Sequence, residues 1–488
     1  KTYDRQRDNM ETQALEKTFD THDEFNRKPI AENIIRLLTS PIDLSPMVID
    51  GGWGTGKTEF CKKLIRLMQE QHRDYQPVYI DAFRSDHSGE PLLALLAEII
   101  KACTPEDTGE QPSEQRKNIT RKVARAVGFA MKTVAKAAVG HVLKQKWEDV
   151  EEGMSQITND GQEAKNAAAT VAGVATTLAS HSIDATIDAT VEALLKEQIE
   201  AEKNLETLKA CLKELAADKP IILFIDELDR CRPDYAVDML EVIKHVFDIE
   251  NVKVVLVTNT KQLRAVINHR YGAEVDAQKY LDKFLKYSFA LPDKIVDQSE
   301  EGRALVSVHY FERLIKDSGI GGVLISGYRV MECINEMIRR NNLSLRETER
   351  LVRFLEIYHS LSHGLRDRNE CVLWLRVVGV FIFCFYPSLM DDINKNRTDA
   401  REFAQLFNLQ SWPDMLDEPH YLKKVDVIAA MLILNSKIED PRFTLLKSNE
   451  KYYWQTQIDK YFGSEAINWG LSVLKNTFQV LSFEQTPQ

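Results

Sequence analysis

Residues 46–71 read PMVID-GGWGTGKT-EFCKKLIRLMQEQ, and this stretch decides the fold. Pro46–Asp50 is a short apolar run bounded by Pro and Gly, as expected of a buried parallel strand. Gly51–Thr58 then follows the pattern G-x-x-x-x-G-K-[ST]. Lys57–Gln71 carries apolar residues at helical spacing. Strand, glycine-rich loop and helix therefore follow one another in the order that this loop pattern requires.

The loop pattern predicts a binding site for nucleotide phosphates. Phosphate oxygens need many N–H donors from one tight backbone curve, and glycines allow the dihedral angles and the close approach. Lys57 would bring a charge to the β- and γ-phosphates, and Thr58 would place its hydroxyl on Mg²⁺. The next helix points its positive N-terminal end at the anion. The positions expected to contact the nucleotide are Gly51, Gly52, Trp53, Gly54, Thr55, Gly56, Lys57, Thr58 and Glu59.

A second strand ends in two acidic residues. Ile221–Ile225 is strongly apolar, and Asp226 and Glu227 follow it directly. The carboxyl ends of parallel strands face the ligand crevice, so we expect both acids at the nucleotide. Asp226 is placed to hold Mg²⁺, and Glu227 to polarise the attacking water as a general base. Arg230 and Arg232 follow, and each could contact a γ-phosphate, a neighbouring subunit or only nearby carboxylates.

Strands and helices alternate in the first part of the chain. Further strands are predicted at Pro77–Phe83 and Val252–Val257, each followed by a helix. This order predicts an α/β fold with a parallel sheet and helices on both faces. We expect residues 1–104 and 217–300 to be two halves of one core. Residues 105–216 would be a helical insertion between them, and residues 301–488 a helical C-terminal region.

Composition limits the class of protein. The chain has 488 residues, 44% hydrophobic and 28% charged, with a formal net charge of −11. These values are ordinary for a globular protein and argue against nucleic-acid binding over the whole surface. The seven cysteines are scattered, which suggests reduced thiols in the cytoplasm. The most apolar run, Cys371–Phe385, is too short to span a bilayer and contains Arg376, so we expect a buried helix.

Taken together, these motifs resemble the KAP family of P-loop NTPases. The resemblance lies in Asp23–Arg27 (DEFNR) before the first strand, the loop at Gly51–Thr58, Ile80–Phe83 (IDAF) and Ile225–Pro233 (IDELDRCRP). It continues through Asp238–Val257, Tyr280–Phe284 and Phe289–Pro292, with a weaker similarity at Ser344–Arg353.

The resemblance implies an additional-strand P-loop NTPase, similar to AAA proteins, that binds ATP with Mg²⁺ and has a catalytic glutamate. Bacterial relatives are often linked to defence against phage or plasmids. Many members carry a transmembrane hairpin in the insertion. Here the corresponding region contains Lys132, Lys136, Lys144 and many small residues, so we expect no integral membrane insertion.

Three polar residues outside the two motifs are further candidates. Arg27, in the segment before the first strand, is expected near the nucleotide. Asn259 stands after the fourth strand where many relatives have Asp, and it or Thr258 could sense the γ-phosphate or cap the next helix. Arg346 could be an arginine of a lid helix that touches phosphate, or part of a solvated helix face paired with Glu347 and Glu349. Lys283 and Lys286 are weaker candidates for a charge acting across subunits.

The insertion contains a basic stretch. Arg116–Lys146 has nine Lys or Arg residues and no Asp or Glu. Such a helix could pack on the acidic remainder of this chain, dock on an acidic partner, bind nucleic acid or lie on a membrane surface.

The functional expectation is an ATPase that acts as a switch or motor. We expect a homo-oligomer with a protein partner or effector, located in the cytoplasm and peripheral to the membrane if it meets one. One alternative is a nucleic-acid translocase or helicase, since residues 226–229 resemble the D-E-x-D of helicases, but this would need a second sheet domain downstream. Another is a nucleotide-binding scaffold with little turnover, against which intact Lys57 and Glu227 argue.

Overall fold

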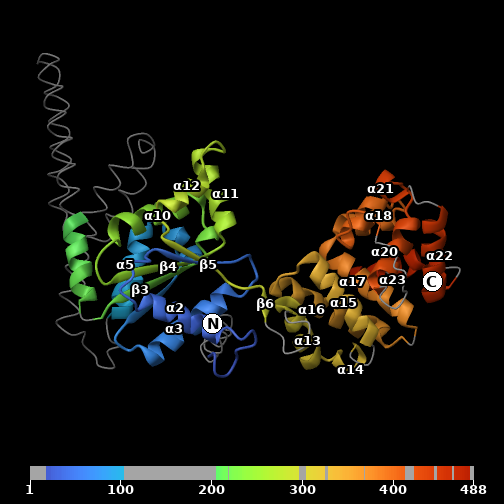
Figure 1. Cartoon of the computed structure of the whole chain (residues 1–488), viewed down its shortest axis with the longest axis horizontal. Coiled ribbons are helices and arrows are strands. Elements are labelled where there is room, and N and C mark those ends of the chain that lie inside the picture. Colours follow the sequence, from blue (N-terminus) through green and yellow to red (C-terminus); the bar gives the residue numbers. More distant parts are fainter. Residues whose placement is uncertain are drawn as a thin grey trace, which may run out of the picture. The chain divides into compact units, whose positions relative to one another are not determined.

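The computed structural model describes residues 18–103, 205–217, 219–295, 304–324, 328–367, 369–412, 423–444, 448–463 and 466–483 (Figure 1). The chain divides into two compact units. The first, which we call the sheet unit, comprises Ile30–Asp50 and Cys61–Phe289. The second, the helical unit, comprises Lys1–Pro29, Gly51–Phe60 and Ala290–Gln488. The phosphate loop thus groups with the C-terminal helices.

The sheet unit is built on five strands in the order β2-β3-β4-β1-β5. They are β1 (Met47–Asp50), β2 (Gln76–Asp81), β3 (Ile221–Asp226), β4 (Val252–Thr258) and β5 (Tyr287–Ala290). The pairs β2–β3, β3–β4 and β1–β4 are parallel. This arrangement confirms the predicted α/β fold with a parallel sheet, and β5 adds an edge strand that the sequence analysis did not predict.

Helices cover both faces of the sheet, so successive residues of the central strand β3 are buried on opposite sides. Every residue of β3 is buried, and alternate ones belong to a core cluster shared with α5 and α10. Figure 1 shows α2 and α3 on one side of the sheet and α10, α11 and α12 on the other. These helices are α2 (Lys28–Leu38), α3 (Lys57–Gln71), α5 (Pro91–Cys103), α10 (Pro233–Val246), α11 (Thr260–Tyr271) and α12 (Ala277–Asp282).

One predicted strand is too long. The strand expected at Pro77–Phe83 ends at Asp81, and Ala82–Ser85 forms the short helix α4. The Asp81 side chain accepts a hydrogen bond from the N–H of Arg84 and so caps α4, which ends the strand. The last part of the expected insertion is also visible: residues 205–216 are helical, with Leu208 and Leu212 buried in the core cluster. The basic stretch Arg116–Lys146 lies outside the described residues.

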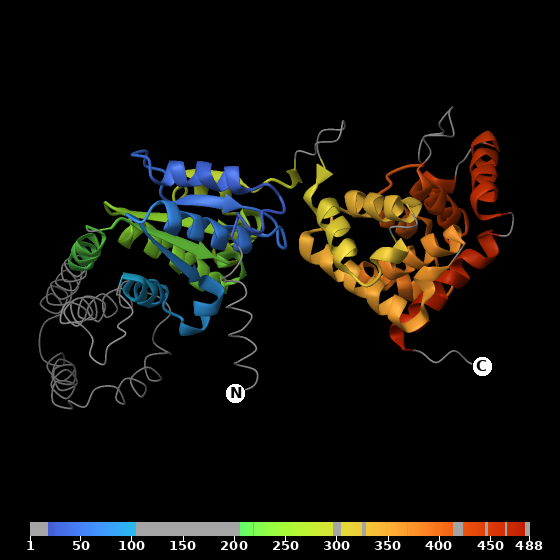
Figure 2. The same ribbon diagram turned by 90° about the horizontal axis from the view of Figure 1, so that it is seen from below.

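The helical unit surrounds a separate hydrophobic core. After the two-stranded sheet of β6 (Lys294–Ile295) and β7 (Ala304–Leu305), the described residues form helices, which Figure 2 shows from a second direction. The second sheet that the helicase alternative requires is not found in this described part. The helices are α13 (Val306–Asp317), α14 (Gly321–Leu324), α15 (Tyr328–Asn341), α16 (Leu345–Ser362), α17 (Glu370–Phe385), α18 (Pro387–Asn394), α19 (Ala400–Leu406), α20 (Lys424–Leu434), α21 (Pro441–Thr444), α22 (Ser448–Phe462) and α23 (Ala466–Ser482).

The most apolar segment of the chain is a core helix of this unit. Most of α17 is buried, and it packs against α16 and α23. Arg376 donates to the carbonyl oxygen of Gly364 at 2.6 Å and forms an ion pair with Asp367 at 2.9 Å. Within the described residues, no helix has the length and apolarity needed to cross a membrane.

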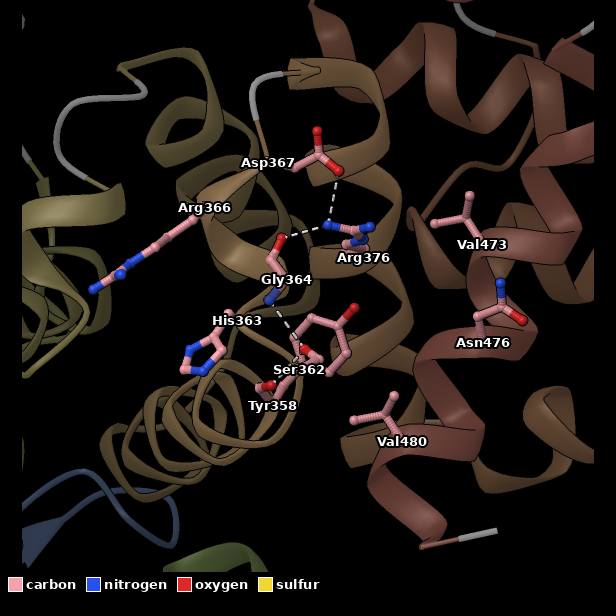
Figure 3. A pocket seen from close by; sticks show the side chains of 10 residues that line it. All are labelled: Tyr358, Ser362, His363, Gly364, Arg366, Asp367, Arg376, Val473, Asn476 and Val480. Atoms are coloured by element: carbon pink, nitrogen blue, oxygen red, sulfur yellow. Dashed lines mark hydrogen bonds and ion pairs between the residues drawn. The ribbon is translucent and has the colours of Figure 1, made fainter. Parts of the chain in front are cut away.

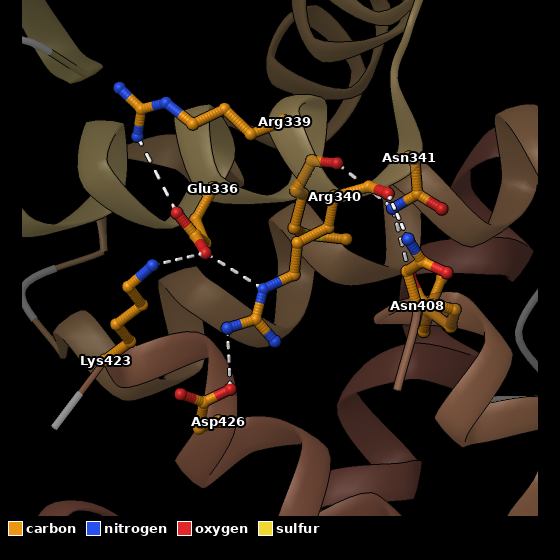
Figure 4. Close-up of polar contacts among 9 residues, drawn as sticks. Glu336, Arg339, Arg340, Asn341, Asn408, Lys423 and Asp426 are labelled. Atoms are coloured by element: carbon orange, nitrogen blue, oxygen red, sulfur yellow. Dashed lines mark hydrogen bonds and ion pairs between the residues drawn. The ribbon is translucent and has the colours of Figure 1, made fainter. Parts of the chain in front are cut away.

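A group of charged side chains joins α15 to α20 (Figure 4). Glu336 accepts hydrogen bonds from Arg340 at 3.0 Å and from Lys423 at 2.8 Å. Arg340 also pairs with Asp426, with 2.7 Å between Nη2 and Oδ1. The side chains of Glu336, Arg340 and Asp426 are between 11% and 16% exposed, so these pairs are mostly shielded from water. We call Glu336, Arg340, Lys423 and Asp426 the α15–α20 charge cluster.

Candidate nucleotide-binding site

The phosphate loop has the backbone that its glycines predict. Gly54 and Gly56 have φ angles of +75° and +82°, a conformation that L-residues rarely adopt. A Cβ atom on Gly54 would lie 2.8 Å from Ser344 Oγ, and one on Gly56 would lie 3.3 Å from Arg27 Nη1. Both positions thus favour glycine for conformation, and Gly54 also for space. The loop begins at the carboxyl end of β1, since Gly51 follows Asp50 directly.

The lysine of the loop is held against the loop backbone. Lys57 Nζ donates to the carbonyl oxygens of Gly51 at 2.6 Å and Gly52 at 2.9 Å, and the residue is buried. Thr55 Oγ1 also donates to the Gly52 carbonyl oxygen. The loop is therefore closed by hydrogen bonds to its own carbonyls. Trp53 is half exposed, and Thr58 follows Lys57 in the first turn of α3.

Arg27 supports the loop from the segment before β1. Its guanidinium donates to the carbonyl oxygen of Thr55 at 3.2 Å and to that of Pro292 at 3.3 Å. Burial lowers the pKa of Arg27 to about 10, partly offset by Glu59 and Asp23. The side chain thus joins three distant parts of the sequence at the phosphate loop, namely its own segment, Thr55 and Pro292.

The first turn of α16 contacts the same loop. The N–H of Leu345 donates to the carbonyl oxygen of Gly54 at 3.0 Å. Ser344 and Glu347 form a capping box, which fixes where α16 begins. The Cβ atom of Arg346 would lie 3.1 Å from a Cβ on Gly54, so Arg346 starts beside the loop.

The two acids considered as partners of Arg346 are engaged elsewhere. Glu347 accepts hydrogen bonds from the backbone and hydroxyl of Ser344 at 2.8 Å. Glu349 accepts one from the hydroxyl of Tyr310. These contacts weaken the alternative in which Arg346 only pairs with the acids of its own helix.

Acidic residues gather at the carboxyl edge of the sheet. Asp81 is the register partner of Asp226, and both end their strands. Asp50 ends β1, and its Oδ1 accepts a hydrogen bond from the N–H of Thr260 at the start of α11. Asp226 is buried, with Oδ1 accepting from the N–H of Glu227 at 2.8 Å and Oδ2 from the hydroxyl of Tyr79 at 3.1 Å. The strand ends thus bring three carboxylates to one edge.

Glu227 is held in an unusual conformation. Its φ and ψ angles are 60° and 25°, the left-handed region, which is uncommon for non-glycine residues and is often found at functional sites. Burial raises the pKa of Glu227, Arg230 lowers it, and Asp226, Asp81 and Asp229 raise it further. Arg230 forms an ion pair with Glu227, with 3.0 Å between Nη1 and Oε1.

The other polar residues of this motif stabilise the loop after β3. Arg232 donates from its backbone N–H and from Nε to the two carboxylate oxygens of Asp86, at 3.1 and 3.0 Å. The buried hydroxyl of Thr258 donates to Asp229 Oδ1 at 2.9 Å. Both Arg230 and Arg232 pair with nearby carboxylates, which is one of the three roles considered for them.

Asn259 caps α11. Its Oδ1 accepts from the N–H groups of Lys261 at 3.2 Å and Gln262 at 3.4 Å. Asn259 therefore has the capping role that was one of its two alternatives. The amide nitrogen of its side chain is the group that could contact a phosphate. Lys286, considered for a role across subunits, pairs with Asp43 at 2.6 Å.

The helical unit contains a cavity that the sequence analysis did not predict (Figure 3). It has a volume of about 370 Å³ and lies among the end of α16, the turn after it, α17 and α23. Arg376, held by Asp367 and Gly364, faces Asn476 and Val473 of α23, whereas Arg366 points away from them. The ion pair between Arg376 of α17 and Asp367 of the turn after α16 lies at this cavity, and no sequence motif links the two residues.

Tyr79, Asp81 and Asp86 are polar residues near the acidic edge that the sequence analysis did not name as site residues. Tyr79 and Asp81 lie two apart on β2, so they share one face of the strand. The alternation of side chains along a strand was the sequence signal that could have placed Tyr79 beside Asp81. Their register against β3 is a long-range feature that the motifs do not contain.

The parallel sheet, the glycine-rich loop after β1 and the acidic end of β3 define a P-loop NTPase domain. The model of the KAP family P-loop domain matches residues 27–362, which is more than half of the chain. The chain therefore belongs to the KAP family, and its P-loop domain is a nucleotide-binding domain.

A curated relative gives a further comparison. The chain is 23% identical over 273 residues to the "Phage T7 exclusion protein" of Escherichia coli strain K12. The matched part covers 55% of this chain and 33% of that protein, so the chain spans about a third of the relative's length.

Proposed function

We propose that this protein is a magnesium-dependent ATPase in which Lys57 and Asp226 act on the same bound triphosphate. The observation that carries the proposal is the shared sheet. β1, which leads into the phosphate loop, and β3, which ends in Asp226, are both paired in parallel with β4. Asp50 lies opposite Thr258 and Asp226 opposite Val257, so both strands end at the same level of β4.

The residues at this edge fit a magnesium ion. Mg²⁺ prefers hard oxygen ligands and usually takes only one or two from the protein, with phosphates and water supplying the rest. Thr58 and Asp226 would hold it, and the ion would neutralise charge that develops on the phosphates. Asp226 is buried, and its carboxylate is oriented by two hydrogen bonds. No cluster of three or more His, Cys, Asp or Glu ligands occurs in the described residues, and such a cluster is not needed here.

Glu227 acts as the general base in this proposal. A carboxylate in a protein becomes a better base near neutral pH when burial and like charges raise its pKa, and both raise the pKa of Glu227. Arg230 holds the carboxylate at 3.0 Å and would stabilise charge once the glutamate turns to the attacking water. Asn259 would orient the γ-phosphate through its amide nitrogen, since its oxygen caps α11.

The contact between α16 and the phosphate loop supports a nucleotide-driven switch. Leu345 donates to Gly54, and Arg346 begins beside the same residue. A phosphate bound in the loop would attract Arg346, so occupancy would change the contacts of the first turn of α16. The helical unit could then report the nucleotide state to a partner protein.

The wider biological role is also part of the proposal. The similarity to a phage exclusion protein supports a role in defence against phage. We also propose a cytoplasmic location, because the seven cysteines are scattered along the sequence. We further propose a homo-oligomer, which measurement of the particle mass with and without ATP would test. Binding of nucleic acid would be assigned to Arg116–Lys146 and tested separately with a variant lacking this charge.

Calorimetric titration of ATP in the presence of magnesium tests the proposal. Lys57→Ala should weaken binding by about 10–100-fold, since a hydrogen bond to a charged group contributes about 1.5–3 kcal/mol. The matched control is Lys101→Ala, whose side chain is 80% exposed on α5 and should leave affinity unchanged. Equal affinities for the wild type and Lys57→Ala would overturn the proposed site.

A further inference from the structure

Tyr79 and Asp226 lie on the same face of the sheet. Asp81 is two residues after Tyr79 on β2 and is the register partner of Asp226 on β3. Val78 and Ile80 instead belong to the core cluster shared with α5 and α10. Tyr79 therefore points to the face covered by α3, and Lys62 of α3 lies over its ring, 5.3 Å from the centroid.

The Tyr79 hydroxyl is a permanent hydrogen-bond donor. It donates to Asp226 Oδ2 at 3.1 Å, across the two paired strands. A tyrosine hydroxyl has an ordinary pKa of about 10, so it keeps its proton at neutral pH. The proton must then be shared with an acceptor, and a carboxylate is the strongest acceptor available.

Two bonds from different strands fix the carboxylate. The N–H of Glu227 holds Oδ1 at 2.8 Å from within the β3 motif, while Tyr79 holds Oδ2 from β2. A carboxylate held at one oxygen can rotate about its last bond, whereas one held at both oxygens cannot. Partners of this kind orient metal ligands, and their loss typically reduces metal affinity about 10–100-fold.

We propose that Tyr79 is a positioning residue whose hydroxyl holds the Asp226 carboxylate in the orientation that binds the magnesium ion of the nucleotide complex. This inference rests on the function proposed above. It assigns the metal affinity of the site to a residue of β2, outside both sequence motifs.

The test compares Tyr79→Phe with Tyr75→Phe. Both remove one hydroxyl and keep the ring, but the Tyr75 hydroxyl donates to the Thr39 carbonyl oxygen instead. Mn²⁺ replaces Mg²⁺ as the probe, and its dissociation constant in the presence of ATP is measured by electron paramagnetic resonance. Tyr79→Phe should bind Mn²⁺ about 10–100-fold more weakly than the wild type, with Tyr75→Phe unchanged. ATP affinity in EDTA should be the same in all three proteins.

The outcomes separate this inference from the proposed function. If the wild type shows no Mn²⁺ binding with ATP, the proposed function fails. If the wild type binds and a folded Tyr79→Phe binds equally well, only the role of Tyr79 is overturned. In an Asp226→Asn background the hydroxyl has no carboxylate to orient, so Tyr79→Phe should have no further effect, and a further loss there would contradict the inference.

A second measurement keeps the native hydroxyl in case Tyr79→Phe does not fold. 3-Fluorotyrosine at position 79 should show a ¹⁹F resonance that moves when Mg²⁺ is titrated into the ATP complex, and that stays fixed when ATP is added in EDTA. A resonance that does not move when Mg²⁺ is added to the ATP complex would also overturn the inference.

Discussion

Arg230 Nη1 lies 3.0 Å from Glu227 Oε1, and the two residues are three apart at the end of β3. Their side chains are 30% and 19% exposed, so water screens the pair only in part. The pair holds the proposed base while its backbone is in the left-handed region. Arg230 therefore influences both the position and the protonation of Glu227.

Replacement of Arg230 should shift the pH dependence of turnover. Burial is the main cause that raises the pKa of Glu227, and Arg230 opposes it. Arg230→Met removes this opposition, so the pKa should rise and the acidic limb of the pH–rate profile should move to higher pH. The measurement is phosphate release at saturating ATP and magnesium between pH 5 and 9.

The control for this shift is Arg264→Met, because Arg264 of α11 bonds Gln278 of α12 and is not among the charged groups that shift the pKa of Glu227. If Arg230→Met lowered the rate equally at every pH, Arg230 would act on the phosphates and not on the protonation of Glu227.

The Gly54→Ala change should weaken nucleotide binding. Gly54 has φ +75°, and an added Cβ would lie 2.8 Å from Ser344 Oγ. Gly89 has nearly the same φ, +73°, but an added Cβ there would have no neighbour within 4 Å. Gly89→Ala should therefore destabilise the fold by about 1–2 kcal/mol through the left-handed backbone alone, with ATP affinity unchanged. Gly54→Ala should lose ATP affinity in addition, measured by calorimetry, and unchanged binding would argue against the tight contact with α16.

Thr258→Val should loosen the loop after β3. The fully buried Thr258 hydroxyl bonds Asp229, and a buried polar group that loses its partner costs about 1–3 kcal/mol. Denaturant unfolding should show a loss of this size. Thr456→Val, which removes an exposed hydroxyl on α22, should show much less. Equal midpoints for the two variants would mean that the bond to Asp229 contributes nothing to stability.

The α15–α20 charge cluster should stabilise the helical unit. Arg340→Met leaves Glu336 and Asp426 without their shared partner, and breaking a buried pair costs about 3–5 kcal/mol. Lys395→Met, which breaks an exposed pair with Asp391, is the control and should change stability little. Thermal unfolding followed by circular dichroism measures both.

The pH dependence of this effect has a definite sign. The pKa of Glu336 is lowered in the folded protein by Lys423 and Arg340, against the opposing effect of burial. The contribution of Glu336 to the stability of the fold is thus present above the ordinary glutamate pKa, and it is lost as the pH falls through the lowered pKa. The stabilities of the wild type and Arg340→Met should therefore become more similar as the pH falls. A stability difference that grew on acidification would contradict the assignment of this effect to Glu336.

Much of the sheet unit could be predicted because its signals are local. The apolar runs of β1, β3 and β4 and the glycines after β1 each lie within a few adjacent residues. The buried helix expected at Cys371–Phe385 also occurs, as α17, since its apolar run is a local feature. Family membership followed from the same motifs.

The contacts that orient the site could not be predicted in the same way. The bond from Tyr79 to Asp226 joins residues 147 apart, and the one from Leu345 to Gly54 depends on how α16 meets the loop. The strand expected at Pro77–Phe83 was too long because the apolar pattern does not reveal that Asp81 caps a helix. Strand register and helix packing decide these contacts, and neither is a property of one segment.

Single-turnover hydrolysis by Glu227→Gln tests the central claim most directly. The variant and the wild type are each loaded with radiolabelled ATP and magnesium, and binding and phosphate release are followed on the same sample. The variant should bind ATP as tightly as the wild type and release phosphate about 10²–10⁴-fold more slowly, since only the proton acceptor is lost. Phosphate release at the wild-type rate would show that Glu227 is not the base and would contradict the proposed mechanism.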